Sequence, residues 1–388
     1  MWAAGILLVA SAQSAPGVDD QKVAAAIERG VAWLRKAKSH GSDLSKKKLA
    51  PVRNADELIL LTFLHSGVAP EDPKVQQLLA SVLAAPLDKT YSVAVRAMAL
   101  EELDRVRYQS HLARCALYLI DNQLVNGQWG YGDPSPAADA MAVDASPTGR
   151  PRGGKPLKKV AVRTTRVGTG TGDFSNSQYA ALGLRACHDA GVVLPKETLT
   201  RAAQAWVVAQ TAGPPPAGGT PSLPSGRKPR GWCYDHPCSS PAVHHPYGTM
   251  TAGGVGALAI YDHLLGRESK RNGPLLDGLA WLQVHYTVET VPGPIEWDGI
   301  TKSTYVPYYL YALERAAILT GNEKLGAHVW YADGVQVLLQ AQKADGSWWM
   351  DDWGTDTWDT CFALLFLKRA TRPLVASVDR FKPAEVDK

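Results

Sequence analysis

Two acids near the C-terminus have the residue types and spacing for proton chemistry. Residues 356–360 read Asp-Thr-Trp-Asp-Thr, so two carboxylates stand three residues apart at the start of an apolar helical stretch. A positioned carboxylic acid can donate or accept a proton in catalysis. The same side chains can instead cap the helix and complement its dipole. Asp356 and Asp359 are therefore candidate catalytic or ligand-contacting residues, with a structural role as the alternative.

A second stretch, residues 233–238, reads Cys-Tyr-Asp-His-Pro-Cys and offers ligand types for a metal. Zinc binds Cys, His and Asp, so a zinc site formed by Cys233, Asp235, His236 and Cys238 is one interpretation. The spacing matches no common zinc signature, and in an exported protein the two cysteines can equally form a disulfide. Free thiols are the third alternative. The sequence indicates no other cofactor.

Acids in aromatic-rich segments raise a carbohydrate-active alternative. These acids are Glu296 and Asp298 beside Trp297, Asp351 and Asp352 beside Trp353, and Asp235. Glycoside hydrolysis requires two carboxylates that face each other across a cleft. The alternative for each acid is a solvated position in a loop. The sequence therefore allows a glycan hydrolase or lyase only if two of these acids face each other across a cleft in the folded protein.

Helices of two alternating kinds must position these residues. Amphipathic helices, with apolar residues at helical spacing along one side, are expected at residues 23–34, 73–84, 108–123, 196–210, 274–286 and 328–342. Each is followed by a helix that is apolar or small nearly all round, at residues 56–65, 91–103, 175–190, 247–265, 303–319 and 357–370. A helix that is apolar on every face is buried. Six outer and six inner helices predict a closed all-α toroid, (α/α)6.

The lengths of the connections identify the face that we expect to be functional. Links from an outer helix to the following inner helix are long, and they gather over the N-terminal ends of the inner helices. Long loops on a rigid scaffold commonly carry binding and chemistry. Aromatic residues gather there too, and we expect these to line a ligand pocket: Trp129, Tyr131, Trp232, Tyr247, Trp297, Tyr305, Trp348, Trp353 and Trp358.

One pattern recurs along the chain, in which an amphipathic helix ends in a glutamine followed by a Gly-x-Trp turn. Residues 123–129 and 342–348 carry it most clearly, and a fainter copy lies at 206–232. These turns, set in paired helices, resemble the QW repeats of the squalene-hopene cyclase and prenyltransferase superfamily. The end of the chain at 359–369 is similar to single-toroid bacterial proteins with prenyltransferase/squalene-oxidase repeats. The resemblance covers roughly residues 20–371 and implies a toroid that handles isoprenoid-like molecules.

The resemblance also implies roles for the two acids. In the cyclases, an Asp-x-Asp-Asp-Thr-Ala motif at the start of an inner helix supplies the acid that protonates an alkene. Asp356 and Asp359 match its first and last acids, but Trp358 stands where the proton-donating acid would be. The motif is incomplete, so a squalene-cyclase-like isomerase that uses Asp359 is an alternative to a protein that only binds its ligand.

Composition and the two ends of the chain bound the remaining expectations. The 388 residues are 45% hydrophobic and carry a net charge of +4, which fits a globular protein, and nothing resembles a nucleic-acid-binding fold.

Residues 1–12 join a short apolar run to a small-residue cleavage signal, which predicts a signal peptide and export. No other stretch is long and apolar enough to span a membrane. A basic insertion at about 141–172 reads as a flexible surface loop that can touch an anionic surface, and 372–388 reads as a C-terminal tail.

We therefore predict an exported α/α toroid, spanning residues 20–371, with a pocket beneath the long connections. The ligand we expect is an apolar or isoprenoid-like small molecule, or an extended peptide segment of a partner. The sequence is compatible both with an enzyme and with a protein that only binds its ligand.

Overall fold

The computed structural model describes ten segments of the chain: residues 17–37, 55–143, 158–213, 223, 226–238, 245–293, 295–297, 300–302, 305–350 and 355–374. The predicted signal peptide lies outside these segments. Within them, no helix combines the length and the apolar character that crossing a membrane would need.

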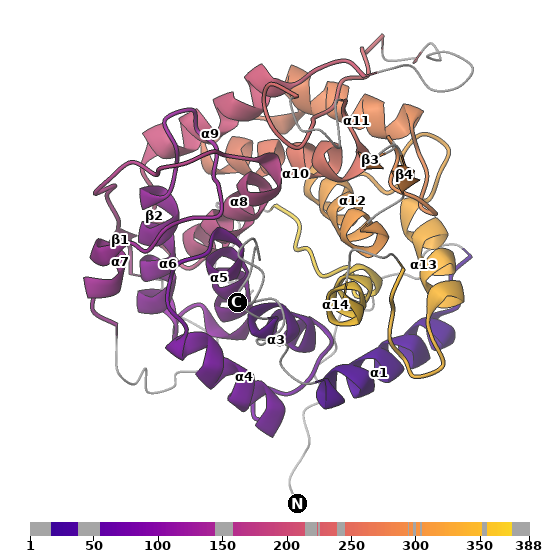
Figure 1. Ribbon diagram of the computed structural model, residues 1–388, viewed down its shortest axis with the longest axis horizontal. Coiled ribbons are helices and arrows are strands. Elements are labelled where there is room, and N and C mark those ends of the chain that lie inside the picture. Colours follow the sequence, from indigo (N-terminus) through magenta and orange to yellow (C-terminus); the bar gives the residue numbers. More distant parts are fainter. Residues whose placement is uncertain are drawn as a thin grey trace, which may run out of the picture.

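The described segments fold into alternating outer and inner helices, which confirms the predicted all-α fold (Figure 1). The outer helices are α1 (Asp20–Lys36), α4 (Pro73–Ala84), α6 (Gln109–Asp121), α9 (Lys196–Ala209), α11 (Gly273–Val284) and α13 (Trp330–Ala341). The inner helices are α3 (Asp56–His65), α5 (Thr90–Asp104), α8 (Phe174–Asp189), α10 (Gly248–Leu264), α12 (Val306–Thr320) and α14 (Asp356–Leu367). Each predicted helix has its counterpart, with ends that differ by at most a few residues.

The inner helices form a closed ring. Each packs against the next in chain order from α3 to α14, and α14 packs against α3. The inner helices are buried along most of their length, as their apolar composition requires. Glycines let neighbours approach closely: a Cβ on Gly254 of α10 would meet the Trp232 ring at 2.6 Å, and one on Gly253 would meet Gln178 Oε1 at 2.6 Å.

Three turns at the ends of outer helices repeat one set of contacts. We call them the Gln–Trp turns, at residues 123–129, 210–232 and 342–348. In each, the glutamine Nε2 donates to a carbonyl of its own turn and to a carbonyl at the next outer helix. The latter acceptors are Thr198 O of α9 (2.9 Å), Pro274 O of α11 (2.7 Å) and Ala26 O of α1 (2.9 Å). The third contact joins the last outer helix to the first.

The tryptophan of each Gln–Trp turn bridges an outer helix and an inner helix. Its indole N–H donates to a carbonyl of the preceding outer helix, at Leu119 (2.7 Å), Trp206 (2.7 Å) or Leu338 (2.8 Å). Its backbone N–H donates to a hydroxyl on the following inner helix, at Ser177 (3.0 Å), Thr251 (3.2 Å) or Thr360 (2.9 Å). Because these polar groups are buried, each satisfied bond helps to fix the helix pair.

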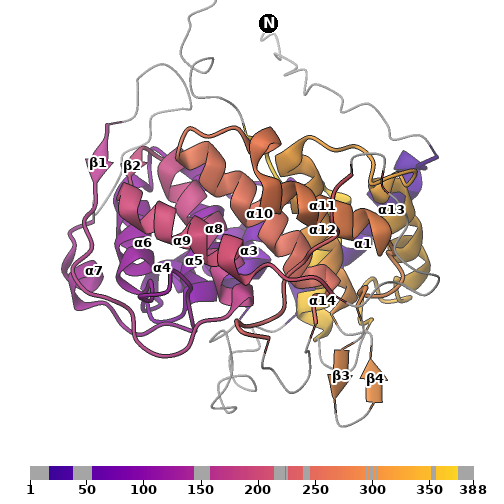
Figure 2. The same ribbon diagram turned by 90° about the horizontal axis from the view of Figure 1, so that it is seen from above.

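The long connections enter at the N-terminal ends of the inner helices, which we call the loop end. The antiparallel hairpin of β3 (Ile295–Trp297) and β4 (Ile300–Lys302) projects from this end (Figure 2). Short elements complete the described fold: α7 (Pro136–Ala140), the 3-10 helix η1 (Ser269–Arg271), and β1 (Val160–Ala161), which pairs in parallel with β2 (Val192–Val193).

The described part of the basic insertion is mostly exposed, and a few hydrogen bonds attach it to the helices. Residues 158–172 run across the C-terminal end of α6, where Thr165 N donates to Asp121 Oδ1 at 2.7 Å and Gly168 N donates to Gln123 O at 2.9 Å. Asp121 is buried and also accepts from the hydroxyls of Ser135 and Thr165. One buried carboxylate thus anchors residues 135 and 165 to the end of α6.

Candidate functional site

The region between the six inner helices is here called the lumen; packed side chains occupy it, and near the loop end these include tyrosines from two helices. Tyr91 of α5 and Tyr308 of α12 are partly buried, and both hydroxyls contact Ser175 Oγ of α8. The Ser175–Tyr308 distance is 3.0 Å, and the two tyrosine hydroxyls lie 3.5 Å apart. Three inner helices thus meet through hydroxyl groups near the entrance of the lumen.

A second layer of side chains lies beneath these hydroxyls. Gln178 Nε2 donates to Tyr308 OH at 2.8 Å, and Gln178 Oε1 accepts from Arg315 Nη2 at 3.1 Å. The Arg315 guanidinium lies against two rings, with Cζ 4.1 Å from the centroid of Tyr311 and 5.4 Å from that of Tyr179. Such placement of a cation over aromatic faces is favourable.

Further ring contacts continue across the lumen. The Tyr91 and Tyr179 centroids lie 4.7 Å apart, and Phe362 of α14 lies 5.2 Å from Tyr308 and 5.9 Å from Tyr311. Rings from α5, α8, α12 and α14 therefore pack into one continuous aromatic cluster. Large rings of this kind suit apolar ligands and carry few groups that need water.

The phenols in the lumen are neutral at ordinary pH. Burial raises the pKa of Tyr91 and of Tyr179 well above the usual value, and it raises the pKa of Tyr311 to about 12. The ionised phenolate is disfavoured there because the buried surroundings solvate a charge less well than water does. These hydroxyls can donate or accept hydrogen bonds, but they supply no strong acid.

Asp173, the N-cap residue of α8, lies two residues before Ser175. Burial raises the pKa of Asp173 to about 6, against the lowering effect of hydrogen bonds from Asn176. Its Oδ1 accepts from Asn176 N at 2.6 Å and its Oδ2 accepts from Asn176 Nδ2 at 2.8 Å. Both oxygens therefore serve the N-cap of α8.

The two acids proposed from the sequence lie at the start of α14. Asp359 is 2% exposed, and its Oδ2 accepts from Met350 N at 2.9 Å. Asp356 is the first residue of the helix, and the N-cap is Thr355, whose Oγ1 accepts from Trp358 N at 3.2 Å. The capping role suggested for Asp356 therefore belongs to the preceding residue. Asp359 holds the segment that follows the last Gln–Trp turn.

Trp358 occupies the same helical position as Ser175. In each Gln–Trp turn, the tryptophan N–H donates to a hydroxyl on the following inner helix, which is Thr360 in α14 and Ser177 in α8. Trp358 and Ser175 each stand two residues before that hydroxyl. The Ser175 hydroxyl lies in the lumen between two tyrosines. The half-buried Trp358 therefore stands where α14 can present a side chain to the lumen, and that side chain is not an acid.

The aromatic residues predicted to line a pocket fall into three groups. Trp129, Trp232 and Trp348 are fully buried and belong to the packing between outer and inner helices, as described above. Tyr131, Tyr247, Tyr305 and Trp358 lie at the loop end, where Tyr131 OH is 3.3 Å from Tyr234 OH. Trp353, Asp298, Asp351 and Asp352 lie outside the described residues. Of Glu296 and Trp297 only the backbone, in β3, is described.

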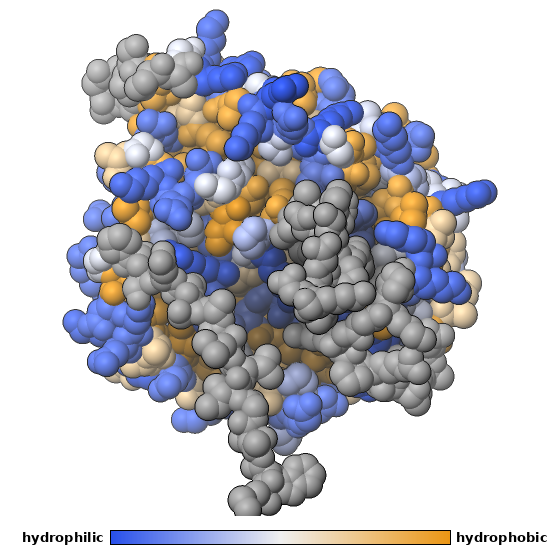
Figure 3. All heavy atoms as spheres, turned by 180° about the vertical axis from the view of Figure 1, so that it is seen from behind, coloured by the Kyte–Doolittle hydropathy of each residue, from blue (hydrophilic) through white to orange (hydrophobic). Residues whose placement is uncertain are grey.

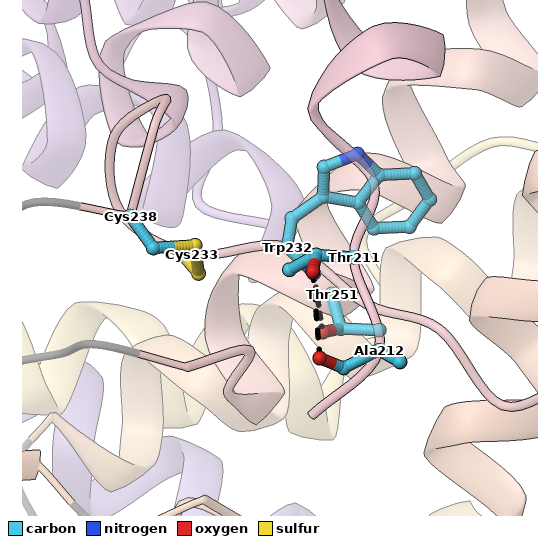
Figure 4. Close-up of a disulfide and its surroundings, with 6 residues drawn as sticks. All are labelled: Thr211, Ala212, Trp232, Cys233, Cys238 and Thr251. Atoms are coloured by element: carbon cyan, nitrogen blue, oxygen red, sulfur yellow. Dashed lines mark hydrogen bonds between the residues drawn. A yellow bond between two sulfur atoms is a disulfide. The ribbon is translucent and has the colours of Figure 1, made fainter. Parts of the chain in front are cut away.

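The zinc interpretation is corrected by a disulfide. Cys233 and Cys238 are bonded, with their Cα atoms 5.6 Å apart (Figure 4). A disulfide sulfur has no thiolate to offer a metal, so these two residues are not zinc ligands. Among the described residues, no group of three or more Cys, His, Asp or Glu side chains is placed to hold a metal ion. The disulfide loop instead fixes Tyr234, whose carbonyl accepts from Phe174 N at 2.8 Å.

The opposite end of the lumen is crossed by the chain after α14 (Figure 1). Thr371 N and Oγ1 donate to the two oxygens of Glu314, at 2.9 and 2.6 Å, and Arg185 Nη2 donates to Arg372 O at 2.7 Å. Arg372 pairs with Glu101 and Glu102 of α5. Figure 3 shows this face from outside, with hydrophilic side chains around a central hollow. The cavity there measures about 50 Å³, too small for an organic ligand.

The residues that build the lumen were not singled out from the sequence. Tyr91, Ser175, Gln178, Tyr308 and Arg315 lie within helices that were read only as buried. A signal was present, because polar and charged side chains such as Gln178 and Arg315 interrupt helices that are otherwise apolar.

The similarity of this chain to known proteins lies in the path of its backbone. No protein-family model and no curated protein sequence matches it. A solved structure of the type II terpene cyclase MstE from Scytonema, in complex with the substrate geranylgeranyl dihydroxybenzoate, is similar at 12% identity and a TM-score of 0.49, covering 90% of this chain and 97% of that one. The apo structure of MstE is similar at 10% identity and a TM-score of 0.32, covering 91% and 99%. At these values neither structure bears on the family, the catalytic residues or the ligands of this chain.

Proposed function

We propose that this protein binds an apolar or isoprenoid-like molecule in the loop-end half of the lumen and does not cyclise it. The observation that carries the proposal is the side chain at the lumen-facing position of α14, which is Trp358. Its neighbour Asp359 is engaged with Met350 N. Polyene cyclisation needs an acid strong enough to protonate an alkene, whereas burial raises the pKa of Asp173, beside the tyrosines, to about 6 and that of Glu314, at the opposite end, to about 7.

The aromatic surface supports binding. Rings from four inner helices contact one another, and two of them, Tyr91 and Tyr308, are only partly buried. A ligand that displaced water from these faces would gain roughly 25 cal/mol for each Å² of apolar surface buried. The rigid ring of helices would lose little freedom on binding, which favours affinity.

A variant that fills the lumen tests the proposal. Ser175→Phe places a bulky ring between Tyr91 and Tyr308, and we expect it to weaken binding of a neutral apolar probe such as farnesol by at least about tenfold. Val208→Phe adds the same ring at an exposed position of α9 and should leave binding unchanged. Isothermal calorimetry measures both variants, and circular dichroism checks that they fold. Equal affinity of the wild type and Ser175→Phe would refute binding in the lumen.

Incubation with a polyene separates binding from catalysis. We expect the wild-type protein to retain squalene or a geranylgeranyl compound, recovered unchanged by organic extraction. Cyclised product above a no-protein blank would instead establish an enzyme.

We also propose that the protein is exported. The Cys233–Cys238 disulfide supports this, because disulfides persist in oxidising compartments. Fractionation of expressing cells, with N-terminal sequencing of the mature chain, tests the proposal, and full-length protein found only in the cytoplasm would contradict it.

A further inference from the structure

The chain after α14 is held against three inner helices at the end of the lumen opposite the loop end. We call residues 370–374 the strap, and its sequence is Ala-Thr-Arg-Pro-Leu. Figure 1 shows it leaving α14 and crossing the ring towards α8. Side chains of α5, α8 and α12, all remote from the strap in the sequence, contact it there.

Two helix side chains bind the backbone of the strap. Glu314 of α12 accepts from Thr371 N at 2.9 Å and from Thr371 Oγ1 at 2.6 Å. Arg185 of α8 donates through Nη2 to Arg372 O at 2.7 Å and to Pro373 O at 3.1 Å. Contacts with backbone N–H and C=O groups supply affinity for a peptide whatever its sequence. Any segment that follows the same path can make them.

Two further acids bind a side chain of the strap. Arg372 Nη1 donates to Glu101 Oε1 at 3.0 Å, and its Nη2 donates to Glu102. The two glutamate side chains are only 10% and 19% exposed, whereas that of Arg372 is 42% exposed. Buried acids of α5 thus meet a surface arginine. Together with the Thr371 hydroxyl bound by Glu314, these contacts select a hydroxyl residue followed by an arginine.

The strap lacks the contacts that make a segment a fixed part of a core. Among the described residues, no backbone–backbone hydrogen bond joins residues 371–374 to the helices. A cavity of about 50 Å³ remains between the strap and the helices, lined by Ala370, Thr371, Met98 and Leu182 among others. Native cores contain few voids larger than a water molecule. The strap is therefore attached largely through polar groups, whose contacts another segment can replace.

We propose that Glu101, Glu102, Arg185 and Glu314 form a peptide-binding site, which residues 371–373 occupy in the same chain. The partner is a protein segment in which a hydroxyl residue precedes an arginine. Three of the four site residues are acids, so charge complementarity favours a basic segment. Because the strap is tethered beside the site, its effective concentration is high and a partner has to displace it. The proposal is independent of ligand binding near the loop end.

Weakening the strap in the full-length protein tests the proposal. Thr371→Ala with Arg372→Ala removes the hydroxyl and the guanidinium of the strap but leaves the site on the helices intact. The probe is a fluorescently labelled peptide of residues 368–374, Lys-Arg-Ala-Thr-Arg-Pro-Leu, and fluorescence anisotropy measures its affinity. We expect the double variant to bind the peptide at least about tenfold more tightly than the wild type. Lys368→Ala, at an exposed position before the strap, should bind it as the wild type does.

A second set of measurements separates recognition of the sequence from attraction by charge. The same peptide with Arg372→Ala should bind the double variant at least about tenfold more weakly, and so should a peptide of the original composition in scrambled order. Adding Glu102→Gln to the double variant should also weaken binding of the original peptide, because a charged acceptor becomes neutral. Circular dichroism checks that every variant folds.

Three results would overturn the proposal. A folded double variant that binds the peptide no more tightly than the wild type would show that the strap is a fixed part of the ring. Equal binding of the scrambled peptide would reduce the site to attraction by charge. A wild-type dimer in light scattering that the double variant does not form would make the occupant the strap of a second copy. None of these results bears on binding of farnesol near the loop end.

Discussion

Gln342 and Ala26 lie 316 residues apart in the sequence, yet Gln342 Nε2 donates to Ala26 O at 2.9 Å. The same amide group donates to Gly346 O at 3.0 Å, and its Oε1 accepts from Arg29. The end of the last outer helix is therefore bonded directly to the first, and this side chain helps to close the ring of outer helices. Gln123 and Gln210 make the corresponding contacts elsewhere in the ring.

Gln342→Ala should lower the free energy of unfolding by about 1–3 kcal/mol, because it leaves partly buried backbone carbonyls without their donor. Gln21→Ala, on the exposed side of α1, should change it by less than about 0.5 kcal/mol. Urea unfolding followed by circular dichroism measures both variants. Equal stability of the two would show that closure does not depend on this contact.

Gly30→Ala should destabilise the protein, although alanine normally favours a helix over glycine. A Cβ at Gly30 would lie 2.8 Å from Trp348 Cζ3 and 3.0 Å from Leu364 Cδ2, and such overpacking costs about 1–3 kcal/mol. Gly256→Ala in α10 is the matched control, because its Cβ would meet nothing closer than 3.5 Å. That variant should gain about 0.5–1 kcal/mol. Thermal unfolding measures the stability of both variants, and a stabilised Gly30→Ala would contradict the packing of Gly30 against Trp348.

Stability should fall as pH rises through neutrality, in part because of Glu314. Burial raises the pKa of Glu314 from 4.5 to about 7. A raised pKa in the folded protein gives stability that is fully present below pH 4.5 and is lost as pH rises through about 7. Glu314→Gln mimics the protonated form, so it should match the wild type at pH 4.5 and exceed it at pH 8 by up to about 3 kcal/mol.

Comparing the wild type with Glu314→Gln cancels the contributions of the other titrating groups to the pH dependence of stability. Burial also raises the pKa of Glu57 to about 7 and lowers the pKa of His65 to about 4, but both residues are present in each protein. Urea unfolding at several pH values provides the measurement. Parallel curves for the wild type and Glu314→Gln would contradict the prediction.

Asp359 should matter for stability and not for ligand affinity. Asp359→Ala removes the acceptor of Met350 N and should cost about 1–3 kcal/mol, whereas Asp359→Asn keeps an oxygen acceptor and should cost less. Both variants should bind farnesol as the wild type does. A folded Asp359→Asn protein that loses turnover of a polyene would restore the cyclase alternative.

Loss of the disulfide should have a modest effect. The double variant Cys233→Ser, Cys238→Ser opens a short loop, and the chain-entropy model gives a loss of about 2 kcal/mol. The zinc content of purified protein should be the same for the variant and the wild type by atomic absorption. Zinc bound at one ion per chain in the wild type and absent from the variant would contradict the disulfide.

The sequence by itself determined the alternation of helices. Amphipathic segments such as 73–84 and apolar ones such as 56–65 became the outer α4 and the inner α3 with the same limits, because helical periodicity and the burial that it requires are local properties of the chain. The sequence also left the disulfide among the alternatives for Cys233 and Cys238, but spacing could not choose between a disulfide and a metal.

The tertiary structure alone decided which side chains meet. Trp129 and Trp232 looked like pocket residues because aromatic residues gather in the long connections, yet they lie between helices, where each indole N–H finds a carbonyl. Tyr308 and Arg315 looked like ordinary members of a buried helix, yet they face the lumen. Periodicity fixes which residues are buried, but in a closed ring an inner helix is buried on every side. The side that faces the lumen depends on how the helices pack around it.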